Sequence, residues 1–266
     1  IQPHGITADT FQSLTRLIHC APHHFFESLQ APEKIEAFKV QKKENYTRLW
    51  QAEESRTGRS MKNYFSENRF TEFHMLKEIL SSLPARCNLH LSNSMSVRYA
   101  NFIGLTVKNK GVHVFANRGT SGIDGCTSTA AGHALSSQVP NILITGDMAF
   151  FYDRNAFWHN YPLPNLHVAV LNNHGGVIFN LIDGPQTLDE KEEYFITKQR
   201  LTASHLAAEF GYEYLKLDSL RKLKSTLKAF YEFDGRTKIL EITSNKKTSL
   251  ETFEQFKNII KKGYEA

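Results

Sequence analysis

The feature that most constrains this fold is a pair of apolar runs in which apolar and polar residues do not alternate. Residues 142–145 (ILIT) form the first run, which stops at Gly146-Asp147, and residues 166–171 (LHVAVL) form the second, which stops at residues 172–176 (NNHGG). Such runs suit strands that are buried on both faces of a parallel sheet, and the segment between them is long enough for a crossover helix. The sequence therefore predicts two parallel strands, each ending in a polar turn that contains glycine.

Short apolar runs and helical segments alternate over the rest of the chain. The expected strands are residues 88–92, 112–116, 142–145, 167–171, 213–217 and 238–243. The segments between them mostly show helical periodicity, most clearly at residues 202–210, 219–233 and 249–262. This alternation predicts an α/β fold with a doubly wound, mainly parallel six-stranded sheet.

Three segments precede the predicted sheet. Residues 8–29 predict a helix, a turn at Pro22 and a short tail, as at the end of a preceding domain. Residues 32–59 are strongly charged with sparse apolar positions and predict a long exposed helix. Residues 67–83 carry aromatic and aliphatic side chains at helical spacing before Pro84, so we expect a helix that packs against the core.

The two polar turns predict one binding site. Ligands of doubly wound sheets lie beyond the carboxyl ends of the strands, so Asp147 and the Asn172-Asn173 pair should face the same crevice. The Asp147 carboxylate, the Asn173 side-chain carbonyl and a main-chain carbonyl near Gly175 are hard oxygen ligands that suit Mg²⁺ together with phosphate oxygens. The helix expected after Asp147 would offer free N–H groups to those phosphates. A metal ion with a diphosphate is the natural joint occupant.

Each turn also has a simpler interpretation. Gly146-Asp147 could be an ordinary turn after a strand and residues 172–176 an ordinary loop, because Gly, Asn and Asp are common in turns. The occurrence of both turns in this order favours the cofactor site.

The spacing of the two turns resembles a known motif. Gly146-Asp147, then 24 residues from Met148 to Leu171, then Asn172-Asn173 is similar to the motif of thiamine-diphosphate-dependent enzymes. Residues 117–125 (NRGTSGIDG) and 128–132 (STAAG) narrow the resemblance to the 2-succinyl-5-enolpyruvyl-6-hydroxy-3-cyclohexene-1-carboxylate synthases of menaquinone biosynthesis.

Two further segments fit the same family. Asn93-Ser94 followed by Val97-Arg98, and residues 175–179 (GGVIF), match its pattern, and the resemblance extends from about Phe65 to the end of the chain. It implies a transferase that decarboxylates 2-oxoglutarate and adds the succinic semialdehyde carbanion to isochorismate. The implied cofactors are thiamine diphosphate and Mg²⁺ or Mn²⁺, and the implied assembly of the full-length enzyme is a homodimer or homotetramer.

The resemblance assigns roles to individual positions. It implies that Asp147, Asn173 and Gly175 bind the metal and that a large aliphatic residue at Ile123 wedges between the two cofactor rings. The complete set of implied cofactor contacts is Ser94, Ile123, Gly146, Asp147, Met148, Ala149, Asn173 and Gly175.

Arg98 and Arg118 are the candidate substrate cations. Both implied substrates are dicarboxylates, and a guanidinium can grip a carboxylate with two parallel hydrogen bonds. Spacing alone favours an arginine on a helix surface at Arg98, but its place in the segment 93–98 (NSMSVR) favours substrate binding. Ile178, Phe179 and Ile182 could form an apolar wall of the substrate pocket or could be ordinary core residues.

The chain departs from the family pattern in three respects. Met148 stands where many thiamine enzymes have glycine, and His174 stands where this synthase commonly has a third asparagine, but neither change removes an expected ligand. The catalytic glutamate belongs to a separate N-terminal domain in this family, and we expect it to be absent from this chain. The expected organisation is therefore the tail of a middle domain (1–30), a charged helical linker (31–64) and the diphosphate-binding domain (65–266).

The composition narrows the class of protein. A share of 41% apolar residues supports a sizeable core, and no run approaches the ~18 apolar residues that span a bilayer, so we expect a cytoplasmic protein without membrane insertion. Three widely spaced cysteines indicate neither a disulfide framework nor a zinc site. The net charge of +5 comes from dispersed lysines, which favours a solvated surface over a nucleic-acid-binding patch.

Two alternative functions remain open from the residues. One is a different thiamine-dependent decarboxylase or an acetolactate-type synthase, against which the segment around Arg118 argues. The other is a non-catalytic phosphate- or nucleotide-binding α/β module, although the chain lacks the GxGxxG and GxxxxGK loops of such modules.

Overall fold

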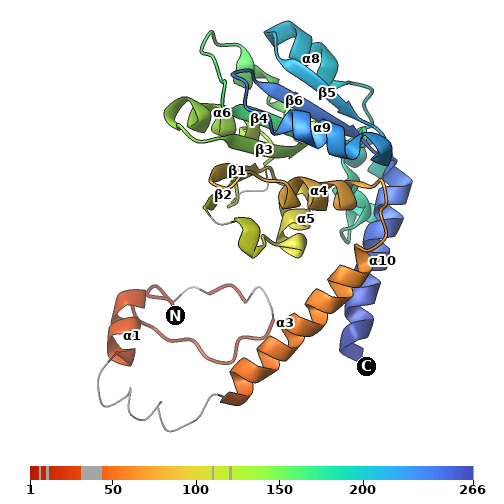
Figure 1. The fold of residues 1–266 in the computed structure, drawn as a ribbon. Helices are drawn as coiled ribbons and strands as arrows, with labels where there is room; N and C mark the ends of the chain where they lie inside the picture. Colours follow the sequence, from red (N-terminus) through yellow and green to blue (C-terminus); the bar gives the residue numbers. More distant parts are fainter. Residues whose placement is uncertain (6, 10–11, 31–43, 110, 120–121, 266) are drawn as a thin grey trace. The chain divides into compact units, whose positions relative to one another are not determined.

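The computed structural model describes residues 1–5, 7–9, 12–30, 44–109, 111–119 and 122–265 (Figure 1). This part of the chain forms two compact units, Ile1–Arg59 and Ser60–Ala266. Residues 31–43 of the expected charged linker lie outside the described residues, as do Thr120 and Ser121 of the 117–125 motif. All residues that the sequence predicts for the site belong to the second unit.

The first unit contains helix α1 (Pro22–Leu29) and most of helix α3 (Glu44–Tyr64). The predicted turn at Pro22 is wrong, because α1 begins there, and residues 12–20, which were expected to be helical, form no helix. Proline fits the first turn of a helix, where its missing N–H would have no partner in any case. No residue of α1 is buried, so this helix contributes little to a core.

The second unit is built on one parallel sheet of six strands. Their order is β2-β1-β3-β4-β6-β5, and every neighbouring pair is parallel, which confirms the predicted fold class. The strands are β1 (Cys87–Leu91), β2 (Val112–Ala116), β3 (Asn141–Gly146), β4 (Leu166–Asn172), β5 (Glu213–Leu217) and β6 (Lys238–Thr243).

Helices connect the strands and cover both faces of the sheet, as Figure 1 shows. The α-helices of this unit after α3 are α4 (Glu72–Ser81), α5 (Met95–Ile103), α6 (Cys126–Ser136), α7 (Asp147–Tyr152), α8 (Ala203–Phe210), α9 (Leu223–Phe230) and α10 (Lys246–Glu265). Short helical turns are η1 (Val107–Asn109), η2 (Arg154–Phe157), η3 (Val177–Asn180), η4 (Pro185–Thr187), η6 (Leu220–Lys222) and the π-helix η5 (Lys191–Ile196).

Two hydrophobic clusters make the sheet doubly wound. On one face, α4, α5, α9 and α10 pack against strand residues such as Leu89 and Ile144. On the other face, α6, α7 and α8 pack against Leu143, Val168 and Ile239. Adjacent residues of one strand thus enter different clusters, because successive side chains of a strand point to opposite faces.

The central strands β1, β3, β4 and β6 are buried along nearly their whole length, whereas the edge strands β2 and β5 are more exposed. This burial explains why the runs at 142–145 and 166–171 lack alternation. β1 pairs with β2 on one side and with β3 on the other. The connections that leave β1 and β3 therefore run to opposite sides of the sheet, which makes the boundary between these two strands the point where the strand order reverses. A crevice at the carboxyl ends of these strands is where ligands of such sheets bind.

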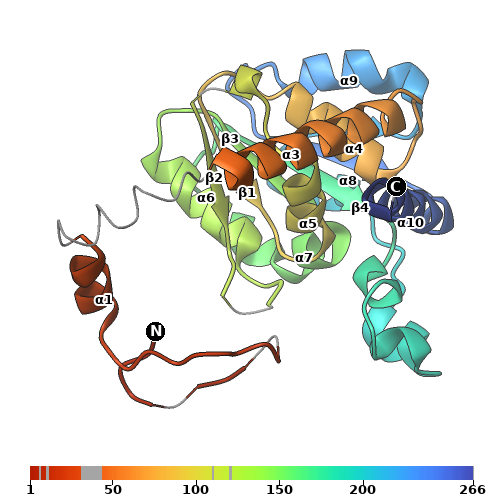
Figure 2. The same cartoon turned by 90° about the horizontal axis from the view of Figure 1, so that it is seen from below.

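The segment after β4 departs from the regular alternation of strands and helices. Residues 177–196, teal in Figure 2, run through short helical turns that project from the sheet instead of forming a crossover helix at once.

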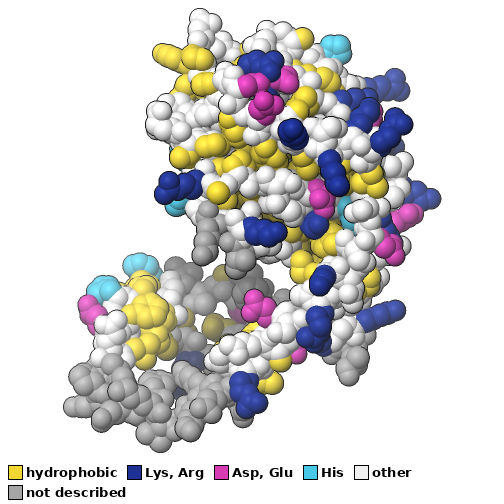
Figure 3. Space-filling view, viewed as in Figure 1, with side chains coloured by type: hydrophobic (Ala, Val, Ile, Leu, Met, Phe, Trp, Pro, Cys, Tyr) yellow, Lys and Arg dark blue, Asp and Glu magenta, His cyan; other side chains and the backbone are white. Residues whose placement is uncertain are grey.

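On the face seen in Figure 3, Lys and Arg side chains are spread among acidic and polar ones. In the described part of the chain, no helix has the length and apolar character needed to cross a membrane.

The helix predicted over residues 67–83 packs against the core as expected. Phe73 of α4 is fully buried, and its ring lies 5.1 Å from that of Tyr99 and 4.8 Å from that of Phe256, measured between centroids. Aromatic pairs at these distances are favourable beyond the area they bury. The same helix, however, also buries a carboxyl group at Glu72, which core packing alone does not explain.

A buried histidine of β4, His167, contacts the C-terminal end of α9. The Nδ1 atom of His167 bonds to the carbonyl of Phe230, and its ring stacks on Phe233 with centroids 4.0 Å apart. Burial lowers the pKa of His167 to about 4, because the charged imidazolium would lose its hydration. The ring is therefore neutral in the folded protein at physiological pH.

The first prediction concerns acid stability. Between pH 6.5 and 4 the unfolded chain protonates His167 while the folded protein does not, so the free energy of unfolding should fall by up to about 3 kcal/mol from this residue as the pH decreases. His167→Gln should make the dependence shallower by that amount, as measured by urea denaturation at several pH values. An unchanged slope in the variant would show that His167 is not held neutral.

Candidate functional site

Loops that follow β1, β2, β3 and β4 surround one cavity of about 580 Å³. These loops meet because the strands are parallel and their carboxyl ends lie at one edge of the sheet. Eight residues predicted for the site line this cavity: Ser94, Arg98, Arg118, Ile123, Met148, Ile178, Phe179 and Ile182. The other predicted residues, which are not part of the lining, are Gly146, Asp147, Ala149, Asn173 and Gly175.

Asp147 links the ends of the two central strands. Its Oδ1 accepts a hydrogen bond from the Met148 N–H at 2.8 Å, and its Oδ2 accepts from the Gly175 N–H and from Gln199 Nε2, each at 2.8 Å. The residue is only 2% exposed. Burial raises the pKa of Asp147 to about 6, although these hydrogen bonds act in the opposite direction. A nearby cation would favour the ionised form.

Asn173 presents an unsatisfied oxygen. Its Nδ2 donates to Glu72 Oε1 at 2.7 Å, whereas its Oδ1 is buried and has no hydrogen-bond partner among the described residues. Leaving a buried carbonyl unpaired costs about 1–3 kcal/mol, so such an atom in a folded protein calls for an explanation. A cation that is coordinated by oxygen atoms, such as Mg²⁺, would give this carbonyl oxygen a partner.

Glu72 is the buried carboxyl group beside this amide. It is 1% exposed, and burial raises its pKa to about 7, with the negative charge of Asp147 acting in the same direction. Two buried carboxyl groups whose pKa values are both raised create an environment that favours a bound cation.

The turn after Asn173 has little room for side chains. His174 adopts a φ of 64°, and a Cβ atom on Gly175 would lie 2.9 Å from the Ile196 carbonyl oxygen. The Gly175 carbonyl accepts from the Val177 N–H at 3.0 Å and keeps a second lone pair. Within the described part of the chain, no group of three or more His, Cys, Asp or Glu residues is placed to hold a metal. A metal here would need the Asn173 and Gly175 oxygens besides the Asp147 carboxylate, and these donors fit Mg²⁺.

The two arginines lie in the same cavity. Arg98 Nη1 donates to the Ser94 carbonyl at 2.8 Å, and Arg118 Nη1 lies 3.3 Å from Asn93 Oδ1. Burial and then the positive charge of Arg118 lower the pKa of the Arg98 guanidinium. Neither arginine forms an ion pair with a described Asp or Glu, so both remain available to an anion. Arg98 lies in helix α5, and its side chain lines the cavity.

Asn93 and Ser94 organise the loop that precedes α5. Asn93 Nδ2 donates to the carbonyl of Asn117 at 2.7 Å and also to that of Gly122, which joins two loops of the cavity. Ser94 has a φ of 75°, a conformation that is strained for a residue with a side chain. Strain of this kind is often found at binding sites, where the surrounding structure holds it.

The apolar residues of the site have mixed roles. Ile178 packs against the hydrophobic core and also lines the cavity. Phe179 pairs with Phe195, with ring centroids 5.4 Å apart, and Ile182 is 36% exposed. Ile123 lies in the loop between β2 and α6 and also lines the cavity.

Several residues of the site are missing from the prediction. Tyr152, Tyr194, Phe195 and Thr197 line the cavity, and Gln199 bonds to Asp147. Tyr152 ends the short helix α7, and Tyr194 and Phe195 lie in the π-helix η5, so neither segment is long or regular enough to show a periodic signal in the sequence. Glu72 does carry a signal, since it precedes Met75, Leu76 and Ile79 at the three-, four- and seven-residue spacing of a buried helical face.

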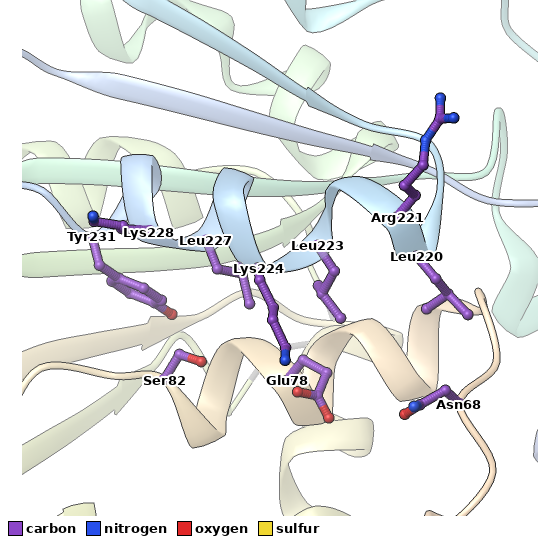
Figure 4. A pocket seen from close by; sticks show the side chains of 10 residues that line it. All are labelled: Asn68, Glu78, Ser82, Leu220, Arg221, Leu223, Lys224, Leu227, Lys228 and Tyr231. Atoms are coloured by element: carbon purple, nitrogen blue, oxygen red, sulfur yellow. The ribbon is translucent and has the colours of Figure 1, made fainter.

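A second hollow lies on another part of this unit. Side chains of α4 and α9 line a groove of about 630 Å³, in which Leu223 and Leu227 lie between the helices and Lys224 points towards Glu78 (Figure 4). The groove contains none of the residues predicted for the site. We therefore take the cavity at the carboxyl ends of the strands as the candidate site.

No family model matches the chain. Searches of curated proteins do find relatives, each named 2-succinyl-5-enolpyruvyl-6-hydroxy-3-cyclohexene-1-carboxylate synthase. The protein from Cytophaga hutchinsonii is 42% identical over 265 residues, which cover 99% of this chain and 46% of the relative. The protein from Flavobacterium johnsoniae is 36% identical over 234 residues, which cover 88% of this chain and 41% of the relative.

A third relative, from Bacteroides fragilis, is 33% identical over 249 residues, which cover 92% of this chain and 42% of the relative. The chain thus spans less than half the length of each of these three relatives. The match to the Cytophaga hutchinsonii protein covers 99% of the chain and so includes the turns that carry Asp147 and Asn173. By sequence, therefore, the chain belongs with the C-terminal part of the 2-succinyl-5-enolpyruvyl-6-hydroxy-3-cyclohexene-1-carboxylate synthase family.

Proposed function

We propose that this chain is the C-terminal, cofactor-binding part of a thiamine-diphosphate-dependent synthase of menaquinone biosynthesis. The reaction is the decarboxylation of 2-oxoglutarate and the addition of the remaining four-carbon unit to isochorismate. The observation that carries the proposal is the pair of strand-end turns. Asp147 accepts a hydrogen bond from the Gly175 N–H at 2.8 Å, and the buried Oδ1 of Asn173 has no hydrogen-bond partner among the described residues. The names of the relatives support the same activity.

Asp147, Asn173 and the Gly175 carbonyl would hold Mg²⁺ or Mn²⁺, and the metal would hold the diphosphate. Main-chain groups of residues 146–149 and of Ser94 would contact the cofactor around it. When bound, thiamine diphosphate supplies an electron sink for breaking and forming carbon–carbon bonds. The role of the chain is to bind and orient this group and to keep the cavity shaped for the substrates.

Arg98 and Arg118 would bind the substrate carboxylates. Both line the cavity and lack an acidic partner among the described residues, so a dicarboxylate would neutralise them. A guanidinium is suited to this role because it presents parallel N–H donors to a carboxylate. Ile123 would pack on the cofactor, and Ile178, Phe179 and Ile182 would form the apolar side of the substrate pocket.

The domain division proposed for the chain follows the same family pattern. Residues 1–30 would end a middle domain, 31–64 would form a linker and 65–266 the diphosphate-binding domain. The glutamate that activates the aminopyrimidine would come from a domain outside this chain, across a homodimer interface within a dimer or tetramer. We expect the assembled enzyme to work in the cytoplasm.

The second prediction tests the proposal by a direct assay. The full-length synthase should release carbon dioxide from 2-oxoglutarate in the presence of thiamine diphosphate and Mg²⁺, whereas the 266-residue chain alone should show no turnover. Pyruvate serves as the competing substrate. Faster turnover of pyruvate by the full-length protein would favour an acetolactate-type synthase, and turnover by the chain alone would refute the expected absence of the catalytic glutamate.

A third prediction concerns Asp147 in the full-length protein. Asp147→Asn retains the shape of the side chain but removes the charge that would bind the metal, so retention of thiamine diphosphate with Mg²⁺ should be lost. Isothermal titration calorimetry measures the affinity. Asp153→Asn is a matched control, because that carboxylate accepts from the Ser128 N–H at 2.7 Å and lies outside the cavity lining. Equal cofactor affinity in the wild type and Asp147→Asn would contradict the assignment.

The fourth prediction concerns Arg118. Arg118→Lys keeps the positive charge but loses the two-pronged geometry, so the transition-state complex should weaken by about 1–3 kcal/mol. This corresponds to a loss in kcat/KM of about 5- to 150-fold for at least one substrate. Arg154→Lys, at a surface arginine that pairs with Glu209, should leave kcat/KM unchanged. If Arg118→Lys behaves like this control, Arg118 has no role in substrate binding.

A further inference from the structure

Glu72 contacts the predicted metal ligand Asn173 from a distant part of the chain. It lies at the first position of α4, and 101 positions separate it in sequence from Asn173, to whose Nδ2 its Oε1 bonds at 2.7 Å. The side chain is 1% exposed and has no ion-pair partner among the described residues. A carboxyl group in such a place is expensive to bury unless hydrogen bonds hold it, so its retention indicates a specific role.

The contact determines the orientation of the Asn173 amide group. An asparagine amide carries two donors on nitrogen and an acceptor oxygen, and its orientation is set by its partners. Because the Glu72 carboxyl oxygen accepts from Nδ2, the amide oxygen must point elsewhere. That oxygen is the buried Oδ1 that has no partner among the described residues.

The neighbouring asparagine provides an internal comparison. Asn172 Nδ2 also donates to a buried glutamate, Glu241, at 2.6 Å. Its Oδ1, however, accepts from the His174 N–H at 3.1 Å and lies 3.2 Å from Gln199 Nε2. The two Glu–Asn pairs thus share one arrangement, but of the two amide oxygens only that of Asn173 lacks a hydrogen-bond partner in the described part of the chain.

We infer that Glu72 is a positioning residue: it holds the Asn173 amide so that Oδ1 is presented to a divalent cation. The inference rests on the proposed function, because that function supplies the cation. Glu72 itself would not bind the metal. Partners of this kind, behind a metal ligand, change metal affinity by about 10- to 100-fold when they are removed.

The test compares two substitutions of Glu72 in the full-length protein. Glu72→Leu has a similar volume but no acceptor for Nδ2, so the amide is free to rotate, and Mn²⁺ affinity in the presence of thiamine diphosphate should fall by about 10- to 100-fold. Glu72→Gln retains an acceptor oxygen and should lose less. Electron paramagnetic resonance of free Mn²⁺ measures the affinity without reference to turnover, and thermal unfolding without metal reports on the fold.

Two controls separate positioning from other effects. Glu78→Leu removes a negative charge from the same helix and should leave Mn²⁺ affinity unchanged, because Glu78 pairs with Lys77 and lines the α4–α9 groove. In an Asn173→Ala background, Glu72→Leu should change the affinity by less than about twofold, since an effect that acts through Asn173 disappears with its side chain.

The outcomes distinguish this inference from the proposed function. If the wild-type protein binds no Mn²⁺ with thiamine diphosphate, the proposed function fails. If the wild type binds Mn²⁺ and Glu72→Leu binds it equally well, only the positioning role is overturned. The inference is also overturned if Glu72→Leu lowers Mn²⁺ affinity equally with and without the Asn173 side chain. It is overturned as well if Glu72→Gln lowers the affinity as much as Glu72→Leu does, because Glu72 would then act through its charge.

Discussion

The hydrogen bond between the Asp147 carboxylate and the Gly175 N–H is the interaction on which the site depends. It connects the end of β3 to the turn after β4 at 2.8 Å, and Gln199 adds a second donor to the same oxygen. Both strands are buried along nearly their whole length, so the sheet fixes the positions of their ends. The distance between the Asp147 carboxylate and the Gly175 N–H is therefore set by the sheet. The cavity with its two arginines is lined by loops that follow the same sheet edge, and Asn173 lies in the turn that this hydrogen bond holds.

Much of this arrangement could be predicted from the sequence, because burial leaves a pattern that can be recognised. The runs at 142–145 and 166–171 show no alternation since both faces of their strands are covered, and this property identifies a parallel sheet. Once the sheet is parallel, the residues after each strand must gather at one edge. That geometry brings Ser94, Arg118 and Met148 to a common cavity without any knowledge of the loops.

Other features depend on contacts that local patterns do not encode. Whether Pro22 ends or begins a helix is decided by its neighbours, and its fixed φ suits both outcomes. Tyr194 reaches the cavity from a π-helical turn, whose rare geometry has no periodic signature in the sequence. Glu72 could have been noticed on the buried face of its helix, but its partner is distant in sequence, and only the fold shows that the two meet.

Asn172 is the last residue of β4 and Asn173 follows it, and their side chains have different partners. One meets Glu241, which also bonds the Ala203 N–H of α8, and the other meets Glu72 of α4. A slip of β4 by one residue would exchange these partners and place the wrong amide beside Asp147. A cation that binds the Asn173 oxygen would therefore stabilise only molecules with β4 in its native register, and ligand binding would select for correct strand pairing during folding.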